Sequence, residues 1–135
     1  MKPLEQIRLV LWTGKLGNLG TVEDTLKGLG CRVQRMNSFE QLRTAIEAHQ
    51  VDVLAVACNS ARPVLSWLRG TPAPLHTEAP PVLTLASAFD VDLYLEAMRL
   101  GAYDCVGLPL AEKELVRLVS QAAELHRSRH LAVTG

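Results

Sequence analysis

The sequence has few cysteines, few aromatic residues and no excess of charge of either sign. Its three cysteines, Cys31, Cys58 and Cys105, are widely spaced and contain no C-x-x-C pair, which argues against a disulfide framework or a zinc site. Lys and Arg number 14, as do Asp and Glu, so no strong field attracts nucleic acid. No run approaches the roughly 18 apolar residues of a membrane span. We therefore expect a cytoplasmic protein with reduced thiols that binds neither nucleic acid nor membranes.

The sequence does contain enough apolar residues for one packed core. Apolar residues make up 48% of the 135 positions and charged residues 21%, which is typical of globular proteins. This length predicts a single domain over residues 1–135, with its core at about 6–127, either complete or a fragment of a longer protein.

Apolar runs that suit buried strands alternate with amphipathic helical patterns along the chain. Ser38 and Gln41 predict a capping box, and His49 is included in the inner face of the helix that follows. Asn59 or Ser60 is expected to cap a later helix, with Pro63 in its first turn. The predicted strands are Ile7–Trp12, Cys31–Met36, Val51–Cys58, Val82–Ala86 and Tyr103–Leu108, and the predicted helices cover about 19–29, 38–49, 59–70, 90–100 and 115–125.

This alternation predicts an α/β fold, a doubly wound five-stranded parallel sheet flanked by helices. In such sheets the functional crevice lies outside the carboxyl ends of the strands. The residues to inspect are therefore those of Trp12–Lys15, Ala57–Ser60, Ala86–Ala88 and Gly107–Pro109.

Three stretches resemble the receiver domain of bacterial response regulators, which has a flavodoxin/CheY-like fold. The segment 51–57, VDVLAVA, is similar to the third strand of the family, and 81–87, PVLTLAS, to the fourth. The segment 97–104, AMRLGAYD, followed by Leu108-Pro109-Leu110, is similar to the Gly-Ala pair, fifth strand and Lys-Pro-Phe of receivers. The resemblance extends over nearly the whole chain and implies a role in two-component signal transduction, in a phosphorelay.

The resemblance also implies where a phosphorylation site would lie, and this sequence lacks nearly all of it. Receivers phosphorylate an Asp with the help of Mg²⁺, an acidic pair, a hydroxyl and a Lys. The sequence has no carboxylate between Glu5 and Glu23 or between Asp52 and Glu78, so a small shift in alignment restores none. The family's positions fall here on Trp12 and Thr13 (acidic pair), Ala57 (phosphoacceptor), Ala86 (hydroxyl), Cys105 (aromatic switch), Leu108 (Lys) and Pro109 (the retained proline).

We therefore interpret the chain as a degenerate receiver, a pseudo-receiver, with no catalytic activity, metal or cofactor. Asp52 does not replace the phosphoacceptor, because about five residues of strand place it about 16 Å from the crevice. Trp12 and Leu108 are expected to fill the space of the missing charged groups.

The resemblance implies protein–protein interaction, independent of phosphorylation. Receivers use the face of their fourth helix, fifth strand and fifth helix, so the expected partners are another protein, an output domain or a second copy of the chain. The candidate interaction residues are Tyr94, Arg99, Tyr103, Glu112 and Arg117.

The alternative is a sensor of a small molecule or of redox state that uses the crevice. Its lining would be Trp12, Cys58, Ser87 and Leu108, with Cys58 as the oxidisable thiol. The glycine-rich segment 13–20, with Lys15, could in principle cradle a phosphate, but its spacing fits no known phosphate-binding motif.

Overall fold

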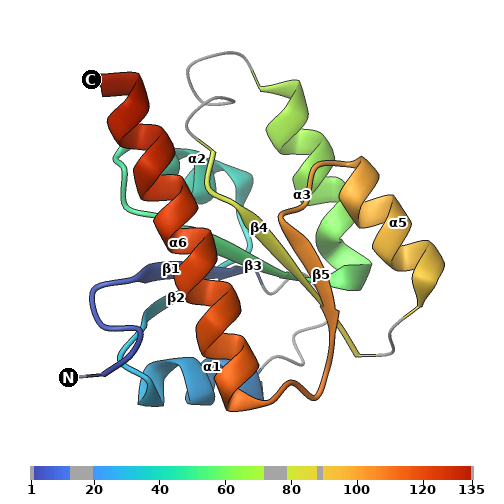
Figure 1. Ribbon diagram of the computed structural model, residues 1–135. Helices are drawn as coiled ribbons and strands as arrows, with labels where there is room; N and C mark the ends of the chain where they lie inside the picture. The colour runs from blue at the N-terminus through green and yellow to red at the C-terminus, as the bar shows by residue number, and fades with distance from the viewer. Residues whose placement is uncertain (1, 13–19, 72–78, 88–89, 135) are drawn as a thin grey trace.

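The computed structural model describes residues 2–12, 20–71, 79–87 and 90–134, with the backbone alone at 58–60 and 130–134. Strands and helices alternate along the described chain (Figure 1). In chain order they are β1 (Arg8–Trp12), α1 (Gly20–Gly28), β2 (Arg32–Met36), α2 (Phe39–Glu47), β3 (Val53–Ala57), α3 (Cys58–Gly70), β4 (Val82–Ala86), α5 (Val91–Arg99), β5 (Asp104–Gly107) and α6 (Glu112–Thr134).

The five strands form one parallel sheet in the order β2-β1-β3-β4-β5. From β1 the chain moves outward to β2 and then returns to add β3, β4 and β5 on the other side. The strand order thus reverses between β1 and β3, which is the switch point of a doubly wound fold. The predicted fold class is confirmed.

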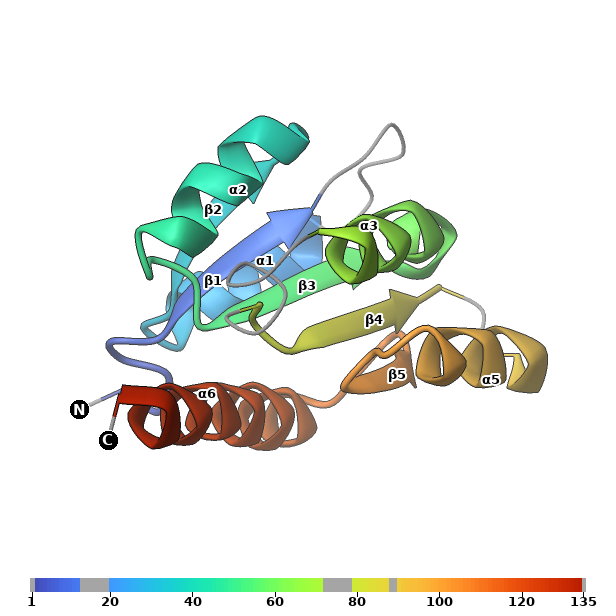
Figure 2. The same cartoon turned by 90° about the horizontal axis from the view of Figure 1, so that it is seen from above.

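Alternate residues of each strand enter two hydrophobic clusters on opposite faces of the sheet. Leu11 and Ala55 pack in the cluster formed with α1 and α6. Val10 and Leu54 pack in the cluster formed with α2, α3 and α5. Figure 2 shows the sheet between these two layers of helices. Because both faces are covered, the central strands are continuous apolar runs and do not alternate with polar residues.

The ends of several elements differ from the prediction. Strand β3 ends at Ala57, and Cys58 begins α3, so Pro63 lies in the second turn of α3 and not in its first. Strand β5 is shorter than expected at both ends, although the N–H of Tyr103 still bonds to the carbonyl of Val82 at 2.8 Å. Helix α6 continues past Leu125 to Thr134, because the polar residues beyond Leu125 are compatible with a solvent-exposed helix.

Helix α2 begins as predicted and ends earlier. The hydroxyl of Ser38 accepts a hydrogen bond from the N–H of Gln41, which confirms this residue as the cap. His49 was expected on the inner face, and this is wrong. It lies beyond the end of α2, is exposed, and has a φ of 56°. A residue in this left-handed conformation cannot continue the helix and turns the chain toward β3.

A glycine permits the tight connection between α1 and β2. Gly30 has a φ of 94°, and a Cβ placed on it would lie 2.8 Å from the Cβ of Lys2. Both the conformation and the close approach of the N-terminal segment therefore require glycine at this position.

No helix in the described part of the chain combines the length and the apolar character needed to cross a bilayer.

Candidate functional site

The carboxyl ends of the central strands meet at one edge of the sheet and carry apolar residues. β1 ends at Trp12, β3 at Ala57 and β4 at Ala86, and all three are buried. The strand register pairs Trp12 with Val56, Ala57 with Leu85 and Ala86 with Gly107, so these residues are neighbours. The predicted positions at the ends of β1, β3 and β4 are thus brought together, and none offers an oxygen to a cation or a phosphoryl group. Thr13 lies outside the described residues.

Three aromatic rings from three elements stack beside this edge. The ring centroid of Phe39 lies 4.9 Å from that of Trp12 and 5.0 Å from that of Trp67, with interplanar angles of 30° and 28°. Trp12 is only 5% exposed, whereas Phe39 is 36% exposed. The large side chain at the end of β1 is therefore held by α2 and α3, the two helices over this face of the sheet.

The structure does not place Trp12 and Leu108 in a common space. Trp12 belongs to the cluster under α2, α3 and α5, and Leu108 packs against the cluster under α1 and α6. Trp12 is buried, as expected of a residue that fills the position of a charged group, whereas Leu108 is half-buried on the opposite face of the sheet. Leu108 is held to β4 by its N–H, which bonds to the carbonyl of Ala86 at 2.7 Å, and its peptide bond to Pro109 is cis.

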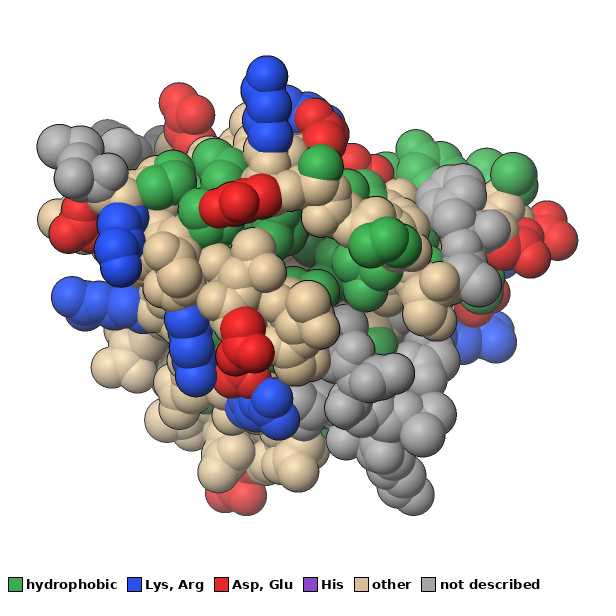
Figure 3. Space-filling view, turned by 90° about the horizontal axis from the view of Figure 1, so that it is seen from below, with side chains coloured by type: hydrophobic (Ala, Val, Ile, Leu, Met, Phe, Trp, Pro, Cys, Tyr) green, Lys and Arg blue, Asp and Glu red, His purple; other side chains and the backbone are tan. Residues whose placement is uncertain are grey.

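The residues expected to line a sensor crevice do not all face one side of the sheet. Two of its four predicted residues, Trp12 and Leu108, face different layers, and Ser87 is an exposed residue after β4. The side chain of Cys58 and the glycine-rich residues 13–19 lie outside the description. Seen from below, the side toward which β4 and β5 run in Figure 1, acidic side chains are scattered and do not gather (Figure 3).

The carboxylates nearest the sequence motif have structural roles. Asp52 directly precedes β3, at the opposite edge from Ala57, and its side chain is 3% exposed. It accepts hydrogen bonds from the backbone N–H of Arg8 at 2.9 Å and from the guanidinium of Arg127 at 3.4 Å. Asp90 caps α5 by accepting from the N–H of Asp92 at 2.8 Å. No group of three or more His, Cys, Asp or Glu side chains that could hold a metal occurs among the described residues.

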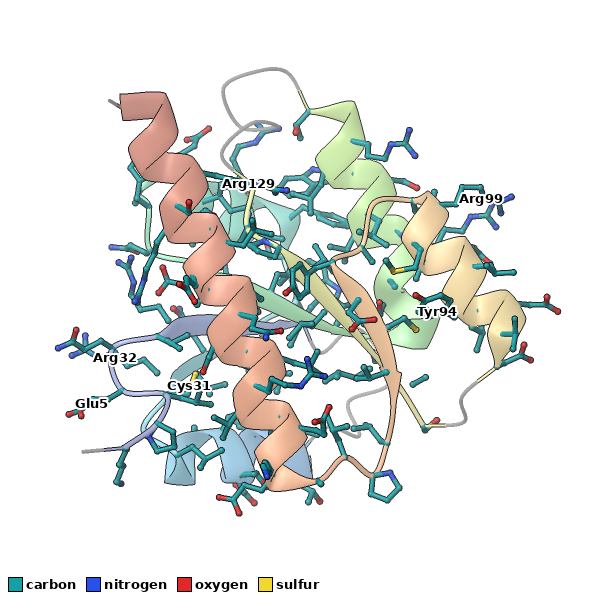
Figure 4. All side chains as sticks on the ribbon, viewed as in Figure 1. Glu5, Cys31, Arg32, Tyr94, Arg99 and Arg129 are labelled. Atoms are coloured by element: carbon teal, nitrogen blue, oxygen red, sulfur yellow. The ribbon has the colours of Figure 1, made fainter. Side chains whose placement is uncertain are left out.

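The two described thiols are buried within the fold. Cys105, at the family's aromatic switch position, packs under α5, and Cys31 lies at the start of β2 (Figure 4). Burial, together with the negative charge of Asp52, raises the pKa of Cys31 to about 12. Both residues are strand core, as the sequence predicted, and the neutral thiol of Cys31 is a poor nucleophile.

The candidate interaction residues are distributed over α5, the edge strand β5 and its flanking turn, and α6, which lies on the opposite face of the sheet from α5. Tyr94 is half-buried between α5 and β5, and Arg99 is exposed at the end of α5 (Figure 4). Tyr103 is half-buried just before β5, while Glu112 and Arg117 are exposed in the first turns of α6. Hydrogen bonds to Glu114 hold Arg117 in place and raise its pKa.

Sequence reasoning missed the most exposed apolar residues of this layer. Val91 is 64% exposed and Leu95 is 56% exposed, one turn apart on α5. The sequence analysis predicted a helix here and singled out Tyr94 and Arg99 on it, but neither of these two residues. A useful signal was available, since apolar residues occur on all sides of α5 (VDLYLEAMR) and exceed what one buried stripe can hold.

The comparisons with known proteins concern the fold. No protein-family model and no curated protein sequence matches the chain. Solved structures do match it, among them NtrX from Brucella abortus, with a TM-score of 0.74 and 16% identity over 94% of this chain. The chain spans 28% of that NtrX chain.

Two other matches are to isolated receiver domains. The signal receiver domain of a protein assigned as a LuxO repressor from Vibrio parahaemolyticus has a TM-score of 0.72 and 16% identity, covering 93% of this chain and 96% of that one. The receiver domain of the sensor histidine kinase PA1611 from Pseudomonas aeruginosa was solved with magnesium in its active-site cleft. It has a TM-score of 0.67 and 19% identity, covering 87% and 98%. The chain therefore has the fold of the receiver domains of bacterial response regulators.

Proposed function

We propose that this chain is a receiver-type signalling module that works without aspartyl phosphorylation, by binding another protein, an output domain or a second copy of itself. The observation that carries the proposal is the chemistry of the carboxyl edge. Trp12, Ala57 and Ala86 end three adjacent strands and are buried among apolar neighbours. A phosphoacceptor and a Mg²⁺ site need carboxylate oxygens at this edge, and the described strand ends supply none.

The partner surface is supported by the exposure of one side of α5. Leu93, Glu96, Ala97 and Leu100 line a small cavity of about 40 Å³ with α3, and Glu96 also pairs with Arg62 of α3. The helical spacing therefore directs Val91, Tyr94, Leu95 and Met98 away from α3. We call these four residues the α5 apolar stripe.

The α5 apolar stripe has the composition of a small protein contact. Tyr94 and Met98 are half-buried at its inner margin, and Val91 and Leu95 are exposed along it. An apolar centre with an aromatic residue and charged neighbours is typical of interfaces. Glu112 and Arg117 are exposed charged residues of α6, which covers the opposite face of the sheet.

The absence of phosphorylation can be tested with acetyl phosphate or beryllofluoride in the presence of Mg²⁺. Neither reagent is expected to change the mass of the protein or its amide NMR spectrum, and Mg²⁺ is not expected to change its melting temperature. Ala57→Asp alone is expected to remain inert, because the metal ligands and the lysine are still missing. A phosphoryl adduct on any Asp of the wild type would contradict the proposal.

The contact surface can be tested by sedimentation velocity over a range of concentrations. If the partner is a second copy, association of the wild type should be lost in Leu95→Glu and retained in Gln41→Glu, which adds the same charge on α2. Monomers at every concentration would exclude the second copy and leave a different protein or an output domain as the partner. Association that survives Leu95→Glu would place the contact elsewhere.

A further inference from the structure

A cavity of about 660 Å³ lies at the edge of the sheet opposite to the carboxyl edge. It lies where β4 and β5 begin, bounded by the ends of α3 and α5 and by the last turns of α6. Figure 4 shows Arg129 of α6 and Arg99 of α5 on two sides of this region. Its inner wall is apolar and includes Leu65 and Leu68 of α3, both buried.

Three arginines from three helices line the cavity, and no described lining residue is acidic. Arg69, Arg99 and Arg129 are exposed, and none of them forms an ion pair with another described residue. Five other arginines of the chain do pair with carboxylates. The cavity therefore concentrates positive charge in a protein whose formal net charge is zero.

The favourable interaction of a cation with a helix C-terminus explains the positions of two of the three arginines, but not that of the third. Arg69 and Arg99 lie in the last turns of α3 and α5, where a cation is favourable, and the Arg69 guanidinium reaches the carbonyl of Arg99 at 3.5 Å. Arg129 lies before the last turn of α6, which contains no basic residue. Its position on the same cavity as the other two is a result of tertiary packing.

The size and chemistry of the cavity indicate the class of ligand. A volume of this order suits a small organic molecule. Guanidinium groups bind phosphate oxygens through two parallel hydrogen bonds, and they do so best where several converge. The phenol ring of Tyr103 and the leucines of α3 supply apolar contact for the rest of such a molecule. We propose that this cavity binds a small organic phosphate, with Arg69, Arg99 and Arg129 as the phosphate-binding residues.

The cavity is distinct from the carboxyl edge of the sheet, where receivers are phosphorylated, and it adjoins the residues proposed for partner contact. Arg99 and Tyr103, two of the predicted interaction residues, both line the cavity. A ligand bound here would contact the end of α5 and the start of β5. It would therefore connect the cavity with the proposed contact surface on α5. The site itself depends on no partner protein, so its test is independent of the proposed function.

The experiment uses ADP and inorganic pyrophosphate as probes, with binding followed by amide NMR titration and by melting temperature. ADP is expected to shift the amide signals of Gly101, Ala102 and Tyr103 saturably and to raise the melting temperature. Arg129→Gln and Arg99→Gln should each weaken ADP binding about tenfold, the usual effect of losing a charge-assisted hydrogen bond. Arg129→Lys should weaken it less, and Arg43→Gln, an exposed arginine of α2, should leave it unchanged.

Several results would overturn the proposal. One is the absence of saturable amide shifts with either probe. Another is a loss of ADP binding in Arg43→Gln equal to that in Arg99→Gln and Arg129→Gln, which would indicate nonspecific attraction. Pyrophosphate that binds as tightly as ADP would contradict an organic ligand. Binding of a polyglutamate peptide without binding of ADP would assign the cavity to an acidic protein segment. Each variant should keep the melting temperature of the wild type in the absence of probe, because the substituted residues are exposed.

Discussion

The ring of Phe39 stacks on the indole of Trp12, with centroids 4.9 Å apart and planes inclined by 30°. Trp12 stands where the resemblance to receivers places part of a metal-binding acidic pair. Here that position is part of the hydrophobic core under α2 and α3. Apolar burial stabilises this edge, whereas neighbouring carboxylates without a cation would repel each other.

Replacing the buried indole should therefore be costly. Trp12→Ala is expected to lower the free energy of unfolding by about 3–5 kcal/mol, because it removes a large core side chain and leaves a cavity. Urea denaturation measures the change. Phe39→Ala is the paired variant, and a double-mutant cycle should give a coupling of about 0.5–1.5 kcal/mol for the stacked rings. A loss below about 0.5 kcal/mol for Trp12→Ala would mean that the ring does not support the core.

Asp52 connects β3 to β1 and to α6, so its removal should destabilise the protein. Asp52→Ala leaves the N–H of Arg8 without its acceptor and removes one of two acceptors of the Arg127 guanidinium, which also bonds to the carbonyl of Gln6 at 2.9 Å. A loss of about 1.5–3 kcal/mol is expected in urea denaturation, since the lost hydrogen bonds go to a charged and buried group. Asp52→Asn should lose less, because an amide oxygen can still accept from Arg8. Asp24→Asn, exposed on α1, should have almost no effect, and an equal effect of the two Asn variants would contradict this role.

The thiol of Cys31 should be unreactive in the folded protein, and its ionisation in the unfolded state should lower the free energy of unfolding at alkaline pH. Its pKa is raised from 9.0 to about 12, so the folded state keeps the proton that the unfolded state releases. The free energy of unfolding should therefore decrease by about 1.4 kcal/mol per pH unit between these two values. Urea denaturation of the wild type and of Cys31→Ala from pH 8 to pH 11 isolates this slope. Rapid alkylation of Cys31 in the native state at pH 8 would contradict its burial.

Glu23 should contribute stability that is lost in acid. Its pKa is lowered mainly by the hydrogen bond from Arg35, with Lys27 as a second cation. Because the folded pKa lies below the unfolded value, the contribution is present above the unfolded pKa and disappears as pH falls through the folded one. The wild type should thus be more stable than Glu23→Gln at pH 7, and this difference should shrink as the pH falls below 4.5, the ordinary pKa of the group. Glu47→Gln, exposed on α2, serves as the control, and a difference that does not shrink with falling pH would refute the ionic origin.

Local patterns in the sequence were sufficient to predict the order and type of the secondary-structure elements. Continuous apolar runs predict strands that are buried on both faces, and the structure has them at β1, β3 and β4. The hydroxyl of Ser38 caps α2 because capping depends on residues only three positions apart. Counting residues along β3 placed Asp52 at the edge opposite to Ala57, and the structure agrees. These features depend on neighbours in the chain, so the sequence by itself determined them.

Only the tertiary structure decided which way side chains point and which residues distant in sequence lie close together. Trp12 and Leu108 end up on opposite faces because the strand pleat and the following turn set each side chain's direction. Val91 and Leu95 are exposed because α3 and β5 cover only part of α5. Arg69, Arg99 and Arg129 are 30 residues or more apart in sequence and line one cavity because three helices end or pass at the same edge of the sheet. No local spacing encodes such a meeting, since it depends on how the helices pack on the sheet.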